Sequence, residues 1–269
     1  MDIFDLKKQP HLSASGINDY VECSLLYKLG RVDKNEPEFV SDSLLFGSAI
    51  HIVLAQFYQE LIAGIKLQLS EVLGLWDEAW HDRAYEIPDI KYSKGKDFDL
   101  LRIDGKKMLS IYYQNLPEID FTILAVEEPF SFTLDTVPVS IIGVYDLVIE
   151  DSAGVVTIID HKTAGRAYGN DEIEKNFQMS VYHLAARKNG YGDREILLRF
   201  DCLLKTKNPR FEQYYTSRSE TDEIRTEKKI TQVWEGINKE VYIPNETSWK
   251  CGYCAHKKAC NNWFLEKAA

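Results

Sequence analysis

Three neighbouring segments in the middle of the chain have the pattern of β-strands, and they restrict the fold more than any other feature. Segments 121–134, 137–149 and 154–160 are rich in Val, Ile, Thr and Phe. Turn-prone residues separate them, namely Asp135 and the run Asp-Ser-Ala-Gly at 151–154. Such runs between turns predict three strands that follow one another as a meander. A sheet of this kind needs other elements to cover it.

The sequence on both sides of the meander supplies those elements. Apolar residues recur near helical spacing after the candidate caps Ser13 and Ser15, so residues up to about 116 are predicted to be largely helical. Downstream the patterns predict a helix over 171–189, strands near 195–206 and 211–217, and a charged helix near 219–238. Together, these predicted helices and strands indicate an α/β or α+β domain around a mixed sheet.

The organisation predicted is one domain over residues 1–269. The chain shows no repeat, no low-complexity tract and no linker rich in Pro, Gly or Ser, and 45% of its residues are apolar, enough for a substantial core. Within this domain we distinguish a mainly helical part, a sheet with its helices, and a cysteine-bearing tail. Their bounds are 1–116, 117–240 and 241–269.

The net charge of −10 argues against a protein that coats nucleic acid non-specifically, because such binding needs many Lys and Arg side chains at phosphates. It does not exclude a nucleic-acid enzyme, since bound divalent cations would be the largest local charges in a carboxylate site. No apolar run approaches the roughly 18 residues of a membrane helix, and no signal sequence opens the chain. We therefore expect a cytoplasmic protein without a membrane partner.

Three polar residues lie on the second and third predicted strands. Asp160 and Lys162 are two residues apart on one strand, so both side chains project from one face and His161 projects from the other. Asp146 lies on the preceding strand, and a short turn joins the two strands. Two carboxylates and a lysine suit metal-assisted phosphodiester hydrolysis, with Mg²⁺ or Mn²⁺ bound by the carboxylate oxygens. The alternative is an exposed edge ion pair between Asp160 and Lys162.

The sequence resembles the PD-(D/E)XK nuclease superfamily and, within it, the RecB-like and CRISPR-associated four-cysteine exonucleases. The resemblance covers nearly the whole chain and depends on the order of several motifs. These are Leu12-Ser-Ala-Ser15 before a helix bearing Cys23, Phe46-Gly47-x-x-x-His51, Gly143-x-x-Asp146, Ile159-Asp160-His-Lys162-Thr163 and Gln178-x-x-x-Tyr182. It implies a restriction-endonuclease-like mixed central sheet flanked by helices.

The resemblance also assigns roles to the motif residues. It implies that His51, Asp146 and Asp160 bind metal together with the backbone carbonyl of His161, and that Lys162 is the catalytic lysine. Taken by residue type alone, His51 in its apolar helical run would be a hydrogen-bonded core residue. Gln178 and Tyr182 are four residues apart on one helix face, where both can contact the substrate or the catalytic groups, and helix packing is the alternative for Tyr182.

Three of the five cysteines, Cys251, Cys254 and Cys260, lie within ten residues of one another, a spacing typical of zinc and iron–sulfur sites. His256 would complete a local zinc site, whereas Cys23 would complete a four-cysteine site. The resemblance implies that Cys23 is the fourth ligand and that the site holds a [4Fe–4S] cluster, which would pin the two ends of the chain together. The fifth cysteine, Cys202, lies in an apolar strand and is predicted to be a buried thiol.

A basic turn joins the last two predicted strands. Lys205, Lys207 and Arg210 fall within this turn and are candidate contacts for DNA phosphates. A solvated hairpin loop without a ligand is the alternative.

These features lead to two classes of function. The first is a Mg²⁺- or Mn²⁺-dependent DNA exonuclease acting on single-stranded ends in repair, recombination, phage replication or CRISPR adaptation. No Walker motif is present, so a helicase partner would be a separate chain. The second is a protein without catalysis, either a silent nucleic-acid-binding module or a zinc-stabilised adaptor.

Overall fold

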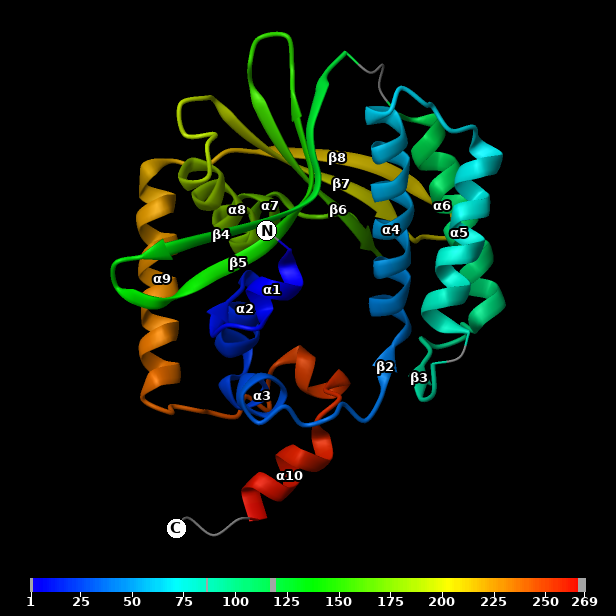
Figure 1. Cartoon of the computed structure of the whole chain (residues 1–269). Coiled ribbons are helices and arrows are strands. Elements are labelled where there is room, and N and C mark those ends of the chain that lie inside the picture. The colour runs from blue at the N-terminus through cyan, green and yellow to red at the C-terminus, as the bar shows by residue number, and fades with distance from the viewer. Residues whose placement is uncertain (1, 86, 117–119, 266–269) are drawn as a thin grey trace. The chain divides into compact units, whose positions relative to one another are not determined.

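The computed structural model describes residues 2–85, 87–116 and 120–265. Its central feature is a six-stranded sheet in the order β1-β5-β6-β7-β8, with β4 paired to β5 (Figure 1). The strands are β1 (His11–Leu12), β4 (Thr122–Leu134), β5 (Val137–Glu150), β6 (Val156–Ala164), β7 (Ile196–Leu204) and β8 (Arg210–Thr216). The short strands β2 (Val40–Ser41) and β3 (Ile90–Lys91) pair separately.

The sheet is mixed. β5 pairs with β6 and β7 pairs with β8 in antiparallel fashion, whereas β6 runs parallel to β7. The parallel pair needs a long crossover, and the helices between β6 and β7 provide it. The prediction of a mixed α/β fold with a central sheet flanked by helices is confirmed.

Helices make up most of the remaining described chain (Figure 1). They are α1 (Ile3–Lys7), α2 (Ala14–Glu22), α3 (Ser24–Tyr27), α4 (Asp42–Ile62), α5 (Leu69–Ala84), α6 (Phe98–Gln114), α7 (Asn170–Glu174), α8 (Phe177–Lys188), α9 (Glu220–Asn238) and α10 (Lys257–Leu265). A π-helical turn, η1 (Lys28–Val32), follows α3, and a 3-10 turn, η2 (Trp249–Tyr253), precedes α10.

Several predicted bounds differ from those observed. The helix expected over 171–189 is two helices, because Asn176 caps α8 by accepting a hydrogen bond from the Met179 amide and so ends α7 before it. β6 continues past the predicted end at Asp160 to Ala164. Of the two candidate caps, Ser13 caps α2 and Ser15 lies inside it. Cys23 is not within a helix, because it lies at the junction of α2 and α3.

The chain forms two compact units, and each combines segments that are far apart in the sequence. Unit 1 consists of Met1–Val40, Ser131–Gly143 and Arg218–Ala269. Unit 2 consists of Ser41–Phe130 and Val144–Ser217.

Unit 2 has an aromatic core between α4, α5 and α6. The rings of Trp76 and Trp80 stack with centroids 5.7 Å apart, and Phe46 packs edge-on against Trp76. Gly105 of α6 lies against the Trp76 ring so closely that a Cβ atom would overlap it. The Trp76 indole donates a hydrogen bond of 2.8 Å to the Arg102 carbonyl, so the polar edge of this buried ring is satisfied.

Unit 1 joins the two ends of the chain. The Tyr20 hydroxyl donates a 2.6 Å hydrogen bond to the Val241 carbonyl, and the Ser24 hydroxyl is hydrogen-bonded to the backbone of Ile243. β1 pairs in parallel with the first half of β5, where His11 lies opposite Ser140. N- and C-terminal segments far apart in sequence are therefore joined by hydrogen bonds to the backbone.

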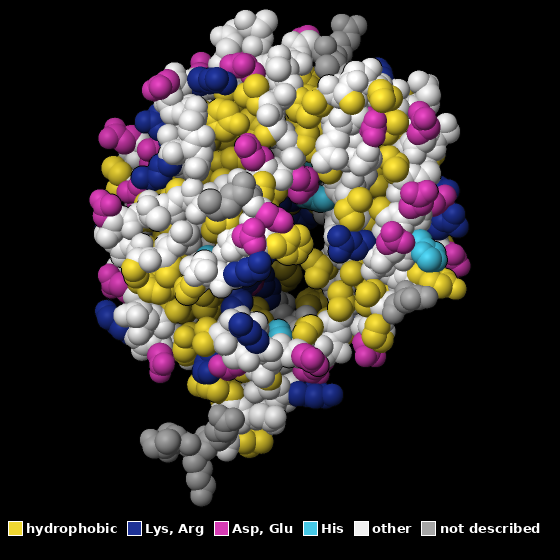
Figure 2. Space-filling model, in the orientation of Figure 1, with side chains coloured by type: hydrophobic (Ala, Val, Ile, Leu, Met, Phe, Trp, Pro, Cys, Tyr) yellow, Lys and Arg dark blue, Asp and Glu magenta, His cyan; other side chains and the backbone are white. Residues whose placement is uncertain are grey.

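Among the described residues, α4 is the one helix that is long and apolar enough to cross a membrane, judged by length and composition. Core helices of water-soluble proteins meet the same criterion, and α4 contributes Phe46, Ile50 and Phe57 to the buried core. On the molecular face drawn in Figure 2, acidic and basic side chains are interspersed with small apolar areas.

Candidate active site

The strands of unit 2 bring Asp146 and Asp160 together. The antiparallel register pairs Leu147 with Ile159, and one residue further along this register Asp146 comes opposite Asp160. Both side chains are buried, with 7% and 1% of their surfaces exposed. Asp146 Oδ2 accepts a 2.7 Å hydrogen bond from the His161 amide, which fixes this carboxylate against β6.

Lys162 lies in a closed polar network with the other predicted residues of β6 and α8. Its Nζ atom is 2.7 Å from Asp160 Oδ2 and donates a 3.0 Å hydrogen bond to Gln178 Oε1. The Gln178 amide nitrogen donates to Asp160 Oδ1 at 2.9 Å and to the Tyr182 hydroxyl at 2.8 Å. Four of the predicted site residues thus hold one another in place, and Lys162 points along the same side of the sheet as Asp160.

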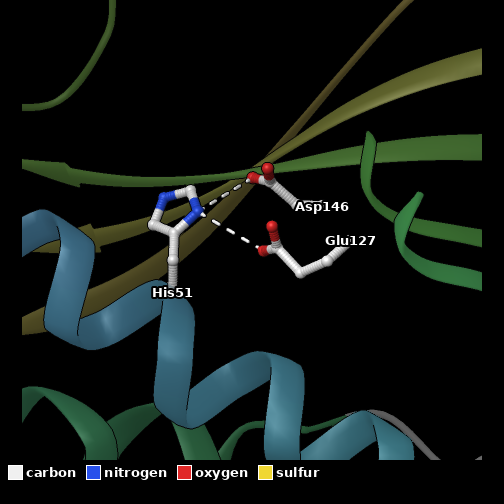
Figure 3. A group of neighbouring side chains, drawn as sticks. All are labelled: His51, Glu127 and Asp146. Carbon is white, nitrogen blue, oxygen red and sulfur yellow. Dashed lines mark ion pairs between the residues drawn. The ribbon is translucent and has the colours of Figure 1, made fainter. Parts of the chain in front are cut away.

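His51 approaches from α4. Its Nδ1 atom lies 3.5 Å from Asp146 Oδ2 and 4.0 Å from Glu127 Oε1, and Figure 3 shows the imidazole facing both carboxylates. One ligand atom from each of His51, Glu127 and Asp146 lies within 4.8 Å of the other two. These three residues come from α4, β4 and β5, so the sheet and the helix together create the group.

Glu127 was not among the predicted site residues. It has a φ of +49°, a conformation that side-chain-bearing residues rarely adopt inside a strand. The sequence held one weak signal, because the acidic Glu127 directly follows the apolar run 123–126 and, with Glu128, precedes Pro129. Nothing in strand periodicity says that this residue departs from the pleat, so sequence reasoning missed it.

Burial and the charge of Asp146 raise the pKa values of the two neighbouring carboxylates, Glu127 and Asp160. Burial raises the pKa of Glu127 to about 7, and the nearby Asp146 charge contributes. Burial also raises the pKa of Asp160 to about 6 against the opposing effect of Lys162. For His51, burial lowers the pKa, but Asp146, Asp160 and Glu127 outweigh it and bring the value to about 9. The site therefore has an excess of negative charge that favours a cation.

His161 occupies the opposite face of β6. Its ring is buried, lies roughly parallel to Tyr58 with centroids 6.0 Å apart, and burial lowers its pKa to about 4. The imidazole is thus neutral at neutral pH and belongs to the core, as its strand position predicted. The expected metal contact of His161 is through its backbone carbonyl, and that role remains a prediction.

The donor set fits a hard divalent cation. Carboxylate oxygens such as those of Asp146 and Glu127 are the ligands that Mg²⁺ and Mn²⁺ prefer, and the His51 imidazole completes the group, whereas Asp160 is not part of it. The buried Oδ2 atom of Asp160 contacts the Lys162 ammonium at 2.7 Å, which leaves its second lone pair for another ligand. A buried carboxylate oxygen with an unused lone pair is what a metal ligand requires.

The four predicted cluster cysteines lie together in unit 1. Cys23, Cys251, Cys254 and Cys260 line one cavity of about 310 Å³, which His256 does not line. The amides of Asn245 and His256 donate to the sulfur atoms of Cys23 and Cys254 at 3.4 and 3.5 Å. Burial raises the pKa of Cys260, and the other three thiols raise it further.

The remaining predictions concern strands β7 and β8. Cys202 is fully buried, and burial raises the pKa of its thiol to about 12. The basic residues do not form one exposed group. The Lys205 ammonium lies 4.6 Å from the centre of the Phe46 ring and burial lowers its pKa, whereas Arg210 pairs with Glu212 at 3.2 Å. Lys207 is exposed in the turn between the strands.

Known proteins resemble this chain over most of its length. Residues 11–261 match the PD-(D/E)XK nuclease superfamily. The Gene 69 protein of Mycobacterium phage D29 is 27% identical over 274 residues, which cover 94% of this chain and 97% of that protein. The crystal structure of a protein named "Putative exonuclease" from Eubacterium rectale aligns with a TM-score of 0.58 and 14% identity over 90% of this chain and 87% of that one, which is a likeness of fold.

Proposed function

We propose, from the premise that this chain belongs to the PD-(D/E)XK nuclease superfamily, that it is a Mg²⁺- or Mn²⁺-dependent deoxyribonuclease that degrades single-stranded DNA from an end. The observation that carries the proposal is the convergence of Asp146, Asp160 and Lys162 on one side of β5 and β6. Divalent metals serve this superfamily, and the group of His51, Glu127 and Asp146 supports a metal at this point of unit 2.

The roles of the residues follow from their contacts. Asp146, Asp160, His51 and Glu127 would hold the metal, which when bound acidifies a water molecule and offsets charge on the phosphate. Lys162 would orient the attacking water and stabilise the negative charge that develops on the phosphate. Gln178 contacts Lys162 and Asp160 at once, so we assign it and Tyr182 to positioning these two groups.

We further place the protein in the RecB-like branch that carries four cluster cysteines, and propose a [4Fe–4S] cluster held by Cys23, Cys251, Cys254 and Cys260. Their common cavity supports this assignment. Zinc is the alternative, and iron and zinc analysis of the purified protein distinguishes the two centres.

The cellular setting follows from the chemistry and from the phage relative. Thiolate ligands for a cluster persist in a reducing interior, so we propose a cytoplasmic enzyme. The similarity to a mycobacteriophage protein favours DNA metabolism during phage replication over repair, recombination or CRISPR adaptation. A helicase would act as a separate partner chain. We propose that both compact units serve this one activity as a single nuclease.

The decisive test compares the wild type with Lys162→Ala. End-labelled single-stranded DNA is incubated with anaerobically purified protein and Mn²⁺ or Mg²⁺, and we expect a loss of cleavage by about 10²–10⁴-fold, typical of removing a catalytic charge or proton-transfer group. The matched control is Lys175→Ala, because Lys175 is exposed and pairs with Asp171 outside the site.

Two outcomes would contradict the proposal. If wild type binds DNA but cuts nothing with either metal, the protein is a silent binding module. If Lys162→Ala cuts as fast as Lys175→Ala, the lysine is misassigned. The rate at which label is released from the 5′ end and from the 3′ end gives the polarity.

A further inference from the structure

A basic cavity lies in unit 1, outside the residues of the metal site and of the cysteine cluster. Its volume is about 550 Å³, and its lining includes Lys7, Lys8, His11, Arg31 and Lys34. All of these residues belong to the N-terminal segment Met1–Val40. The volume falls in the range of cavities that hold a ligand the size of a nucleotide.

The charge of this cavity contrasts with the rest of the chain. The protein has 42 acidic residues and a net charge of −10, yet none of the described residues that line the cavity is Asp or Glu. Four Lys and Arg side chains at one place in such a chain create a local positive potential that the net charge conceals. An anionic ligand is the partner that such a potential attracts.

Two of these cations have no acidic partner among the described residues. Lys8 pairs with Asp5, and Arg31 pairs with Asp19. Within the described residues, Lys7 and Lys34 form no ion pair and are exposed to solvent. The backbone of Lys34 has a φ of +54°, a left-handed conformation, just after the end of η1. Two exposed ammonium groups at one cavity are therefore available for a ligand.

The lining also includes two aromatic residues. Tyr27 is buried with 8% of its surface exposed, and the half-buried Trp234 of α9 contributes a ring from the C-terminal part of the same unit. Aromatic rings beside basic groups are the combination with which proteins bind single-stranded nucleic acid, because the cations contact phosphates and a base stacks on a ring. The lining thus favours a nucleotide chain over a simple anion.

We propose that this cavity is a binding site for the phosphate backbone of single-stranded DNA, separate from the catalytic residues. Lys7 and Lys34 contact neighbouring phosphates, and Trp234 offers a surface for one base. The identity of the strand as DNA rests on the proposed function, whereas the affinity for a polyanionic strand rests on the cavity itself.

The test measures binding without cleavage. The variant Lys7→Gln/Lys34→Gln is compared with Lys107→Gln/Lys228→Gln, which removes the same charge from two other exposed lysines. Fluorescence anisotropy with a labelled strand of about 20 nucleotides in EDTA gives Kd over a range of salt concentrations. We expect Kd to rise about tenfold for the cavity variant, and the slope of log Kd against log salt to fall by about 1.4, since each contact on a single strand contributes roughly 0.7.

A second measurement separates this proposal from the proposed function. Hydrolysis of bis(p-nitrophenyl) phosphate with Mn²⁺ depends on the metal site, so the cavity variant should keep the wild-type rate. If wild type hydrolyses nothing but the cavity variant loses strand binding, the proposed nuclease function is wrong and the proposed strand-binding site is supported. If the two double variants bind the strand with equal Kd and equal salt slope, the cavity proposal is overturned.

A further titration tests whether the cavity binds the phosphates of a strand or those of a free nucleotide. Thymidine 5′-monophosphate is titrated calorimetrically into both double variants. A strand site predicts weak binding of the nucleotide that the substitutions change little. If the cavity variant instead loses the nucleotide and keeps the strand, the cavity binds a free nucleotide and the proposal of a strand site is wrong.

Discussion

The carboxylates around His51 differ in protonation because their surroundings differ. Asp146 accepts a hydrogen bond from the His161 amide and lies beside His51, and although burial opposes the effect, these contacts hold its pKa below the usual value. Asp160 is more deeply buried and Glu127 has no cationic partner other than His51 among the described residues, so burial raises both of their pKa values. Asp146 is therefore the carboxylate that stays ionised and ready for a metal.

Metal binding should release protons at neutral pH. In the metal-free protein His51 keeps its proton up to about pH 9 and Glu127 up to about pH 7, whereas a metal ligand must be unprotonated. The apparent affinity for Mn²⁺ therefore rises with pH until each group has lost its proton, by about tenfold per pH unit for each proton released. Calorimetry in buffers of different ionisation enthalpy counts these protons.

The control for this prediction is His51→Asn. It removes one of the two protons that the metal displaces, so affinity should rise less steeply with pH between about 7 and 9 than in the wild type, and fewer protons should be released on binding. An equal pH dependence in the wild type and in His51→Asn would show that His51 is not a ligand.

At the scale of elements, the position of β6 gives the site its rigidity. β6 lies between β5 and β7, and its pairing with β7 runs from Val156 to Ala164 without a break. Asp160 and Lys162 are therefore held in the interior of a paired strand rather than at its end. α8 then contributes Gln178 as the link between them, and the network is set by the crossover that brings α8 onto the sheet.

The packing of α5 against α6 offers a stability prediction. Gly105→Ala adds a methyl group where the buried Trp76 ring already lies, and the ring has no room to move because it is fully buried. We expect the free energy of unfolding to fall by about 1–3 kcal/mol, as is typical of overpacking. Denaturant unfolding followed by tryptophan fluorescence measures the change.

Gly74→Ala is the matched control on α5. Gly74 is an exposed helical glycine, and apart from its chain neighbours and the backbone of its own helix no described atom lies within 4 Å of the position that an added methyl group would take. Alanine there should raise the free energy of unfolding by up to about 1 kcal/mol through helix propensity. If both variants shift stability in the same direction by similar amounts, the close contact of Gly105 with Trp76 does not restrict this position.

At the scale of the whole molecule, unit 1 is built from three separate stretches of chain. Hydrogen bonds from Tyr20 and Ser24 to residues 241–243 join the first and the last of these stretches. The cysteines reinforce the same junction, because Cys23 lines the cavity of the three tail cysteines. A cluster there would close a loop of more than about two hundred residues, which restricts the unfolded chain.

Loss of one cluster ligand should therefore loosen both ends. Cys23→Ser is expected to reduce bound iron from about four per chain to nearly none and to lower the melting temperature. Proteolysis should then cut within the tail 241–265 at protease concentrations that leave the wild type intact. Cys202→Ala serves as the control, because Cys202 is buried in β7 and should leave the iron content unchanged. Colourless wild-type protein with one zinc per chain would overturn the cluster.

The sequence by itself determined the fold class and the order of the polar motifs. Runs rich in Val, Ile, Thr and Phe between turns predicted strands at 137–149 and 154–160, and side-chain alternation placed Asp160 and Lys162 on one face with His161 on the other. The resemblance to the superfamily, confirmed by the match over residues 11–261, supplied the expected role of His51, which its residue type alone would have left in the core. These features are local, so a linear pattern can encode them.

Only the tertiary structure decided which groups meet. Glu127 joins His51 and Asp146 because its backbone turns out of the strand pleat, and no periodicity of side chains predicts that conformation. The burial of Lys205 on Phe46 and the basic cavity at Lys7 and Lys34 likewise depend on contacts between distant segments. Such contacts are fixed by packing in three dimensions, whereas the sequence records only spacing along the chain.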